Sequence, residues 1–215
     1  WIGTEAGFAV LYNANGAFGA SPGDFDAQRI KVPFEGNTEY VLGEAHISDI
    51  EVDGGNRKWV ATANAGLILL SPDGTEIIRQ YNTENSPIIS NTIYDIEMNH
   101  ETGELYIVTD LGLISLRTDA SYEDPTYEQM TVFPNPVRPD YNGPITLQGI
   151  RYNSDVKVTD AAGNVVYKTQ SNGGTATWHG LNSNGEKVPT GVYFFWTAMN
   201  VQGGENKVAK VLVIR

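Results

Sequence analysis

The sequence predicts an all-β protein in two parts, a partial β-propeller followed by a β-sandwich of seven strands. Three observations indicate this: an internal repeat in the first half, a series of short strands between turn residues in the second half, and a change of charge between them. We expect residues 1–118 to form the last two to three blades of a larger propeller. Residues 119–127 would be a linker, and residues 128–215 the sandwich.

The repeat begins with an aromatic residue and continues to a glycine-containing turn. Its three copies start at Trp1, Trp59 and Tyr106, which are 58 and 47 residues apart. Segments 47–52 and 93–98 precede the second and third copies, and both alternate apolar and polar residues as half-buried strands do. We expect each aromatic anchor to pack between sheets and to bury a large area. Four short strands in about 47 residues are typical of one propeller blade.

The pattern Trp-x-Gly-Thr-x-x-Gly, preceded by an Ile-x-x-Ile strand, resembles the two-component regulator propeller repeat. The resemblance covers residues 1–118, although Tyr106 replaces Trp and the first glycine becomes Ala61 and Val108 in the later copies. A propeller closes with about four to eight blades. We therefore expect the missing blades to lie upstream in a longer parent protein and to pack against this segment.

Charge separates the two parts of the chain. The net charge is −12, and residues 1–127 hold 20 of the 26 acidic residues but only 6 of the 14 basic ones. An acidic surface of this kind argues against nucleic acid as a partner, since phosphates require basic side chains. The chain has no cysteine, which excludes disulfides and thiolate metal ligands.

Sequence motifs for catalysis are not found. The three histidines, His46, His100 and His179, are scattered, and none pairs with another at metal-ligand spacing. No nucleophile elbow, phosphate-binding loop or dinucleotide fingerprint occurs. We therefore expect a protein that is not an enzyme and that holds no metal or cofactor.

Seven strands are predicted in the second part, with Gly- and Asn-rich turns between them. This number of short strands in about 85 residues is typical of an immunoglobulin-like sandwich. The sixth strand has apolar residues on both faces, which predicts either a central strand of the sandwich or a strand that lies under the propeller. The predicted strands are 128–133, 145–150, 155–159, 165–169, 175–178, 192–199 and 207–214.

An ordered set of motifs resembles the type IX secretion C-terminal sorting domain of type A. The motifs are Phe-Pro-Asn-Pro at 133–136, Asp-x-x-Gly-Asn at 160–164, Trp-His-Gly at 178–180, Gly-Val-Tyr at 191–193 and the Lys- and Val-rich strand at 207–215. A generic immunoglobulin-like module, such as the flagellar-hook capping fold, shares several of these motifs. It accounts for neither the Pro-Asn-Pro turn nor the terminal strand.

The resemblance implies an exported protein that passes through the periplasm to the cell surface or outer membrane of a Gram-negative bacterium. Its implied partners are the type IX translocon and the proteins of the sortase and attachment complex. Recognition would involve an exposed edge or the terminal strand of a folded domain. The candidate signal residues are Gly191, Val192, Tyr193, Lys207, Val208, Lys210, Val211, Val213 and Arg215.

Propeller repeats joined to such a sorting domain resemble a surface component of the type IX attachment machinery. That resemblance implies binding of anionic lipopolysaccharide and its presentation to the sortase. The candidate anion contacts are Arg138, Arg151, Lys157 and Lys168. Two alternatives stay open: a secreted cargo protein whose sorting domain is cleaved off, and an adhesion or sugar-binding protein with an unrelated sandwich.

Overall fold

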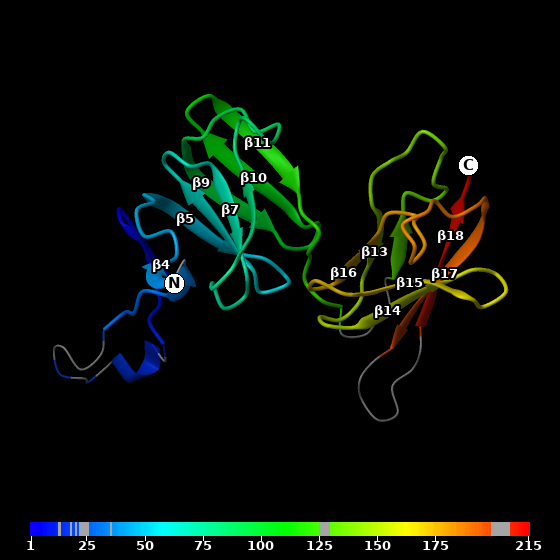
Figure 1. Cartoon of the computed structure of the whole chain (residues 1–215), viewed down its shortest axis with the longest axis horizontal. Helices are drawn as coiled ribbons and strands as arrows, with labels where there is room; N and C mark the ends of the chain where they lie inside the picture. Colours follow the sequence, from blue (N-terminus) through cyan, green and yellow to red (C-terminus); the bar gives the residue numbers. More distant parts are fainter. Residues whose placement is uncertain are drawn as a thin grey trace. The chain divides into compact units, whose positions relative to one another are not determined.

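The computed structural model describes residues 1–12, 14–17, 19, 21, 26–34, 36–124, 130–198 and 207–215. In this part of the chain the secondary structure is β-strand, apart from one 3₁₀ turn at Ala14–Ala17, which confirms the predicted all-β class (Figure 1). The chain divides into two compact units. The first comprises Trp1–Asn99 and Glu104–Arg117, and the second comprises His100–Gly103 and Thr118–Arg215.

The strands of the first unit pair with their neighbours in sequence, always antiparallel. They form a hairpin β1-β2, a hairpin β3-β4, a four-stranded sheet β5-β6-β7-β8 and a three-stranded sheet β9-β10-β11. The bounds are β1 Ile2–Thr4, β2 Gly7–Ala9, β3 Lys31–Phe34, β4 Asn37–Tyr40, β5 Ile47–Val52, β6 Lys58–Thr62, β7 Leu67–Leu70, β8 Ile77–Tyr81, β9 Ile93–Asn99, β10 Glu104–Thr109 and β11 Gly112–Arg117.

The four-stranded sheet is covered on both faces, which explains its apolar sequence. All residues of β6 and β7 are buried. Ile68 and Leu70 pack with Phe8 on one face, whereas Leu67 and Leu69 pack with residues of β9 and β10 on the other. A strand buried on both faces is an uninterrupted apolar run, as Leu-Ile-Leu-Leu is. Successive sheets therefore stack face to face, as blades would. Closure into a propeller stays a prediction.

The three aromatic anchors differ in burial. The expectation that each packs between sheets is wrong for Tyr106, whereas the Trp1 ring, though partly exposed, lies 5.0 Å from the Phe8 ring and 5.1 Å from Lys58 Nζ of the next sheet. Trp59 is 1% exposed, whereas Trp1 and Tyr106 are 37% and 39% exposed. Side chains alternate along a strand. In β10 the buried side holds Leu105 and Ile107, and Tyr106 points the other way. Equivalent positions in a repeat thus have different surroundings in this chain.

Asp53, in the turn between β5 and β6, is the buried polar centre of the first unit. Its carboxylate accepts hydrogen bonds from the backbone N–H groups of Gly55 and Arg57, at 2.9 and 3.0 Å. It also accepts from the Arg57 guanidinium at 2.8 Å and from Trp59 Nε1 at 3.1 Å. Asp53 is 3% exposed and Arg57 6% exposed. This ion pair therefore orients the Trp59 ring and closes the turn.

The Asp53 network predicts a large loss of stability when the carboxylate is removed. Asp53→Ala leaves the Arg57 charge buried without its carboxylate partner, and we expect the free energy of unfolding to fall by about 3 kcal/mol. Chemical denaturation of the 215-residue chain measures this. The matched control is Asp110→Ala at an exposed position, which should change stability by no more than about 0.5 kcal/mol. Equal effects of the two substitutions would contradict the assignment.

Among its described residues the second unit has seven strands, in two antiparallel sheets, β12-β13-β16 and β15-β14-β17-β18; Figure 1 labels β13 to β18. Their positions lie within a few residues of those predicted, although residues 128 and 129 of the first predicted strand are outside the described part. The immunoglobulin-like assignment stays a prediction. The bounds are β12 Thr131–Phe133, β13 Ile145–Gln148, β14 Asp155–Thr159, β15 Val165–Gln170, β16 Thr175–Trp178, β17 Gly191–Ala198 and β18 Lys207–Val213.

Trp178 is the centre of the core between these two sheets. Its ring lies 5.3 Å from the Tyr193 ring and 5.9 Å from the Phe195 ring. Its indole N–H donates to the carbonyl of Leu181 at 2.7 Å, and the Tyr193 hydroxyl donates to the carbonyl of Pro189 at 2.8 Å. Each polar atom of these aromatic residues is thereby satisfied inside the core.

Part of the predicted linker is packed in the second unit. The Ser121 and Thr175 hydroxyls lie 2.7 Å apart, and the Tyr122 ring stacks on His100 at a centroid distance of 4.1 Å. Residues 125–127 of the linker lie outside the described residues. The exact limits 1–118, 119–127 and 128–215 stay predictions.

Candidate recognition surface

The terminal strand β18 is an integral part of its sheet. It pairs along its whole length with β17, from Gly191 opposite Val213 to Thr197 opposite Lys207. Val211 and Val213 are fully buried and belong to the same core cluster as Trp178. Removal of this strand would expose the core, so the signal motif cannot be an unstructured tail attached to a finished domain.

The Pro-Asn-Pro segment partly covers the other edge of β18. Asn135 Nδ2 donates to the carbonyl of Lys210 at 3.1 Å, and Asn135 Oδ1 accepts from the Leu212 N–H at 3.1 Å. One residue pair further along, the Val137 N–H donates to the carbonyl of Leu212, and the Ile214 N–H donates to the carbonyl of Val137. The motif at 133–136 therefore has a structural use, because it holds the terminal strand in place.

The last residue is also held. The Arg215 N–H donates to the Thr190 hydroxyl at 2.9 Å, and the same hydroxyl donates back to the Arg215 carbonyl at 3.3 Å. The Arg215 guanidinium reaches the carbonyl of Gly180, where a Cβ would lie 2.6 Å from Nη2. Gly180, which has a φ of 68°, thus leaves room for this side chain. Burial raises the pKa of the Tyr193 hydroxyl, as Asp160 does to a smaller extent, while Arg215 opposes both.

The predicted signal residues divide between the two faces of the sheet. Tyr193, Val211 and Val213 point into the core, while Val192, Val208 and Lys210 point outward. Gly191 is half-buried beside the Tyr193 ring, and Arg215 is exposed at the end of the chain. The side chain of Lys207 is outside the described part. Sequence reasoning omitted Leu212, which is 40% exposed on the outward face and which strict alternation along β18 could have identified.

The predicted anion contacts do not form one group. Lys157 on β14 and Lys168 on β15 are directly opposite each other, and both are exposed. Arg138 is exposed in the loop after β12, and Arg151 is half-buried in the loop after β13. The structure instead places Lys157 opposite Trp196 of β17. Two of the predicted anion contacts, Lys157 and Lys168, therefore lie on the same sheet face as the outward residues of the predicted signal.

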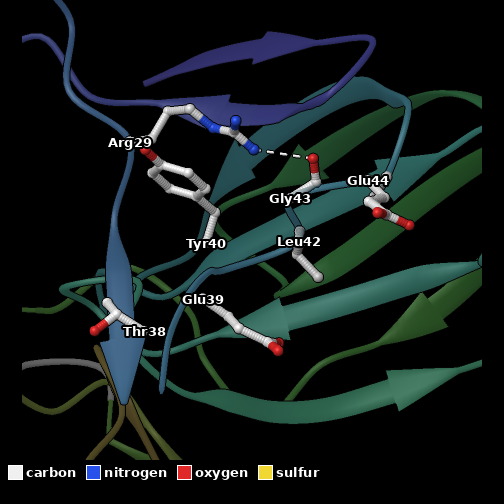
Figure 2. Close-up of a pocket in the computed structure, with 8 residues that line it drawn as sticks. Arg29, Thr38, Glu39, Tyr40, Leu42, Gly43 and Glu44 are labelled. Atoms are coloured by element: carbon white, nitrogen blue, oxygen red, sulfur yellow. Dashed lines mark hydrogen bonds between the residues drawn. The ribbon is translucent and has the colours of Figure 1, made fainter. Parts of the chain in front are cut away.

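A pocket in the first unit is lined by Arg29, whose guanidinium contacts two other lining residues (Figure 2). The Arg29 guanidinium donates to the carbonyl of Gly43 at 2.9 Å and lies 4.0 Å from the centre of the Tyr40 ring. Glu39 and Glu44 also line the pocket. The cation is thus committed to internal contacts, and we assign no chemistry to this pocket.

Carboxylates of β5 and β9 lie close enough to influence one another. Burial raises the pKa of Glu51, and the charges of Glu97, Asp49 and Asp95 raise it further. Within the described residues, no group of three or more His, Cys, Asp or Glu side chains is placed to hold a metal ion. Over the same residues no helix has the length and apolar character needed to cross a membrane.

Asn135 provides a direct test of the edge contact. Asn135→Ala removes two hydrogen bonds to the β18 backbone, and we expect the free energy of unfolding to fall by about 1–2 kcal/mol. Hydrogen exchange at the Leu212 amide should accelerate, since this N–H loses its acceptor. The control Asn184→Ala, in an exposed turn, should leave the Leu212 exchange rate unchanged. An unchanged rate in Asn135→Ala itself would disprove the bracing role.

Two comparisons with known proteins agree with this architecture. Residues 132–214 match the model of the CHU_C type IX secretion signal domain. The whole chain is similar to the solved structure of PorZ, described as an essential bacterial surface component of the type-IX secretion system of Porphyromonas gingivalis. The identity is 35% and the TM-score 0.65, and the match covers 100% of this chain and 29% of PorZ. The chain therefore spans less than a third of that protein.

The other comparisons show only weak similarity or none. The extracellular domain of BT4673 from B. thetaiotaomicron is 14% identical with a TM-score of 0.29, over 90% of this chain and 28% of that one. A search of curated proteins found no significant match. PorZ is the surface component that the sequence motifs resemble, and the comparison confirms this resemblance. Residues 132–214 thus match a type IX secretion signal domain, in a chain that is similar to part of PorZ.

Proposed function

We propose that this chain belongs to an exported cell-surface component of a type IX secretion system and that its second unit is the signal for passage across the outer membrane. The observation that carries the proposal is the match of residues 132–214 to the type IX signal domain, in a unit whose terminal strand is part of the core. Similarity to PorZ over the full chain supports a role in the secretion machinery itself.

Recognition would then involve the translocon and the attachment complex binding a folded domain. Because Val211 and Val213 are buried, a receptor can contact only the outward residues of β18 and the backbone that Asn135 and Val137 leave uncovered. The signal is thus expected to be present only in the folded unit. This gives the translocon a means of selecting domains that have completed folding.

The finer proposal is that the protein acts without catalysis and presents anionic lipopolysaccharide to the sortase. The support is the similarity to PorZ together with the adjacent cations Lys157 and Lys168. Arg138 and Arg151 lie elsewhere, so we assign the anion contact to the pair on β14 and β15.

A cargo role is the second candidate, since a secretion signal domain is also what a cargo protein needs. In that case the second unit would be removed after export and the first unit would carry the activity. The two roles differ in which covalent chain remains at the cell surface.

Export can be tested with a reporter protein directed to the periplasm and followed by the 215-residue chain, in a strain with an active type IX system. We expect the reporter to become accessible to protease on intact cells. The same fusion ending before residue 132 should stay protected. A full fusion that stays in the periplasm would contradict the signal assignment.

The mass of the mature surface protein separates machinery from cargo. For a component of the machinery we expect a C-terminal peptide that includes β18 in the protein released from the cell surface. Cargo processing would leave a chain that ends near residues 120–130. Deletion of the gene gives a second readout, because loss of export of unrelated proteins occurs only if this protein is part of the machinery.

A further inference from the structure

The outer face of the sheet β15-β14-β17-β18 combines exposed apolar side chains with unpaired lysines. Trp196 and Val208 are 42% and 44% exposed, and Val192 and Leu212 are 39% and 40% exposed. These four side chains lie on the two adjacent strands β17 and β18. We call this surface the aromatic–lysine face; its residues are Val192, Phe194, Trp196, Val208, Leu212, Lys157, Lys168 and Lys210.

The strand register places two of the three lysines of this face on β15 and β14 and its apolar residues on β17 and β18. One row across the sheet reads Lys168, Lys157, Trp196 and Val208. Neighbouring strands are about 5 Å apart, so this row extends over about 15 Å. In the next row, Lys210 lies opposite Phe194. Trp196 is fixed in orientation because its indole N–H donates to the Thr159 hydroxyl at 2.9 Å.

The pair Lys157–Lys168 carries a cost that the fold alone does not explain. Like charges directly opposite each other in a sheet are destabilising. Among the described residues, neither lysine has an ion pair with a carboxylate. The acid on the same face, Asp155, accepts a hydrogen bond from Gln170 at 3.2 Å. An external anion is the group that would offset the repulsion.

We propose that the aromatic–lysine face docks on an anionic lipid surface. Tryptophan and lysine together suit a membrane interface, since the ring enters the headgroup region and the ammonium group binds phosphate. Protein–protein interfaces favour aromatic residues but are depleted of lysine, so three lysines argue for lipid over a protein partner. This inference rests on the Lys157–Lys168 anion contact proposed above and deepens it, because it extends the ligand from lipopolysaccharide to the surface of a bilayer with Trp196 as the apolar anchor; it requires neither export nor a sortase.

The test is flotation of the 215-residue chain with vesicles of phosphatidylcholine containing about one-third phosphatidylglycerol. We expect binding that weakens as salt is raised and is much weaker with phosphatidylcholine alone. Lys157→Gln combined with Lys168→Gln should reduce affinity roughly 25-fold, at about fivefold for each lysine. This double variant removes a repulsive pair, so it should be at least as stable as the parent chain and any loss of binding is not due to unfolding.

The matched control is Arg138→Gln combined with Lys187→Gln, which removes two exposed charges of the same unit outside this sheet. It should float as the parent chain does. Trp196→Ala tests the apolar part, and it should weaken binding to anionic vesicles while the chain stays folded by circular dichroism.

Three results would overturn the proposal. The first is failure of the parent chain to float with anionic vesicles, and the second is equal loss of binding in the two double variants. The third is concentration-dependent self-association that Trp196→Ala abolishes, with no effect of vesicles, which would assign the face to a second copy of the chain. Failure of the reporter to be exported would leave the vesicle result unchanged, so the two proposals fail separately.

Discussion

The pairing of β18 with β17 is the interaction on which the second unit depends. Val211 and Val213 lie in the same core cluster as Tyr193 and Phe195. Strand β18 therefore contributes backbone hydrogen bonds to β17 and buried apolar area to the core. Each buried valine is worth about 1.5–3 kcal/mol relative to exposure, which is a substantial part of the stability of a small domain. On the other edge of β18, hydrogen bonds of Asn135 and Val137 hold the strand, and Thr190 binds Arg215.

This constraint divides the strand into two functions. Alternation sends Ala209, Val211 and Val213 of β18 toward the core and Val208, Lys210 and Leu212 to the outer face. The inward residues determine whether the domain folds, and the outward ones, Val208, Lys210 and Leu212, are available to a receptor or a surface. Under the recognition proposed above, a substitution at Val211 would act by unfolding the domain, whereas one at Lys210 would act on the exposed surface directly.

The strands of both units follow from local sequence. Period-2 alternation and the Gly and Asn turns located the seven strands seen in the described part of the second unit and those of the repeat in the first, because these signals involve neighbouring residues. They did not locate β3 and β4, which lie outside the repeat pattern. The contact of Asn135 with Lys210 and Leu212 joins residues more than 70 positions apart, and no local pattern encodes it. The same applies to Lys157 beside Trp196, which depends on the order of strands in the sheet. The unequal burial of Trp59, Trp1 and Tyr106 likewise depends on which sheets cover each copy.

The two units differ in how they cover the apolar faces of their sheets. In the first unit β6 and β7 are covered on both sides, so their side chains are buried and are not accessible to a partner. In the second unit β17 is covered on one side only, yet its uncovered side keeps Val192, Phe194 and Trp196. A solvent-facing strand usually carries polar residues on that side. Retention of a tryptophan fixed by Thr159 beside two opposed lysines is therefore better explained by binding than by folding, since folding would be served equally well by polar side chains there.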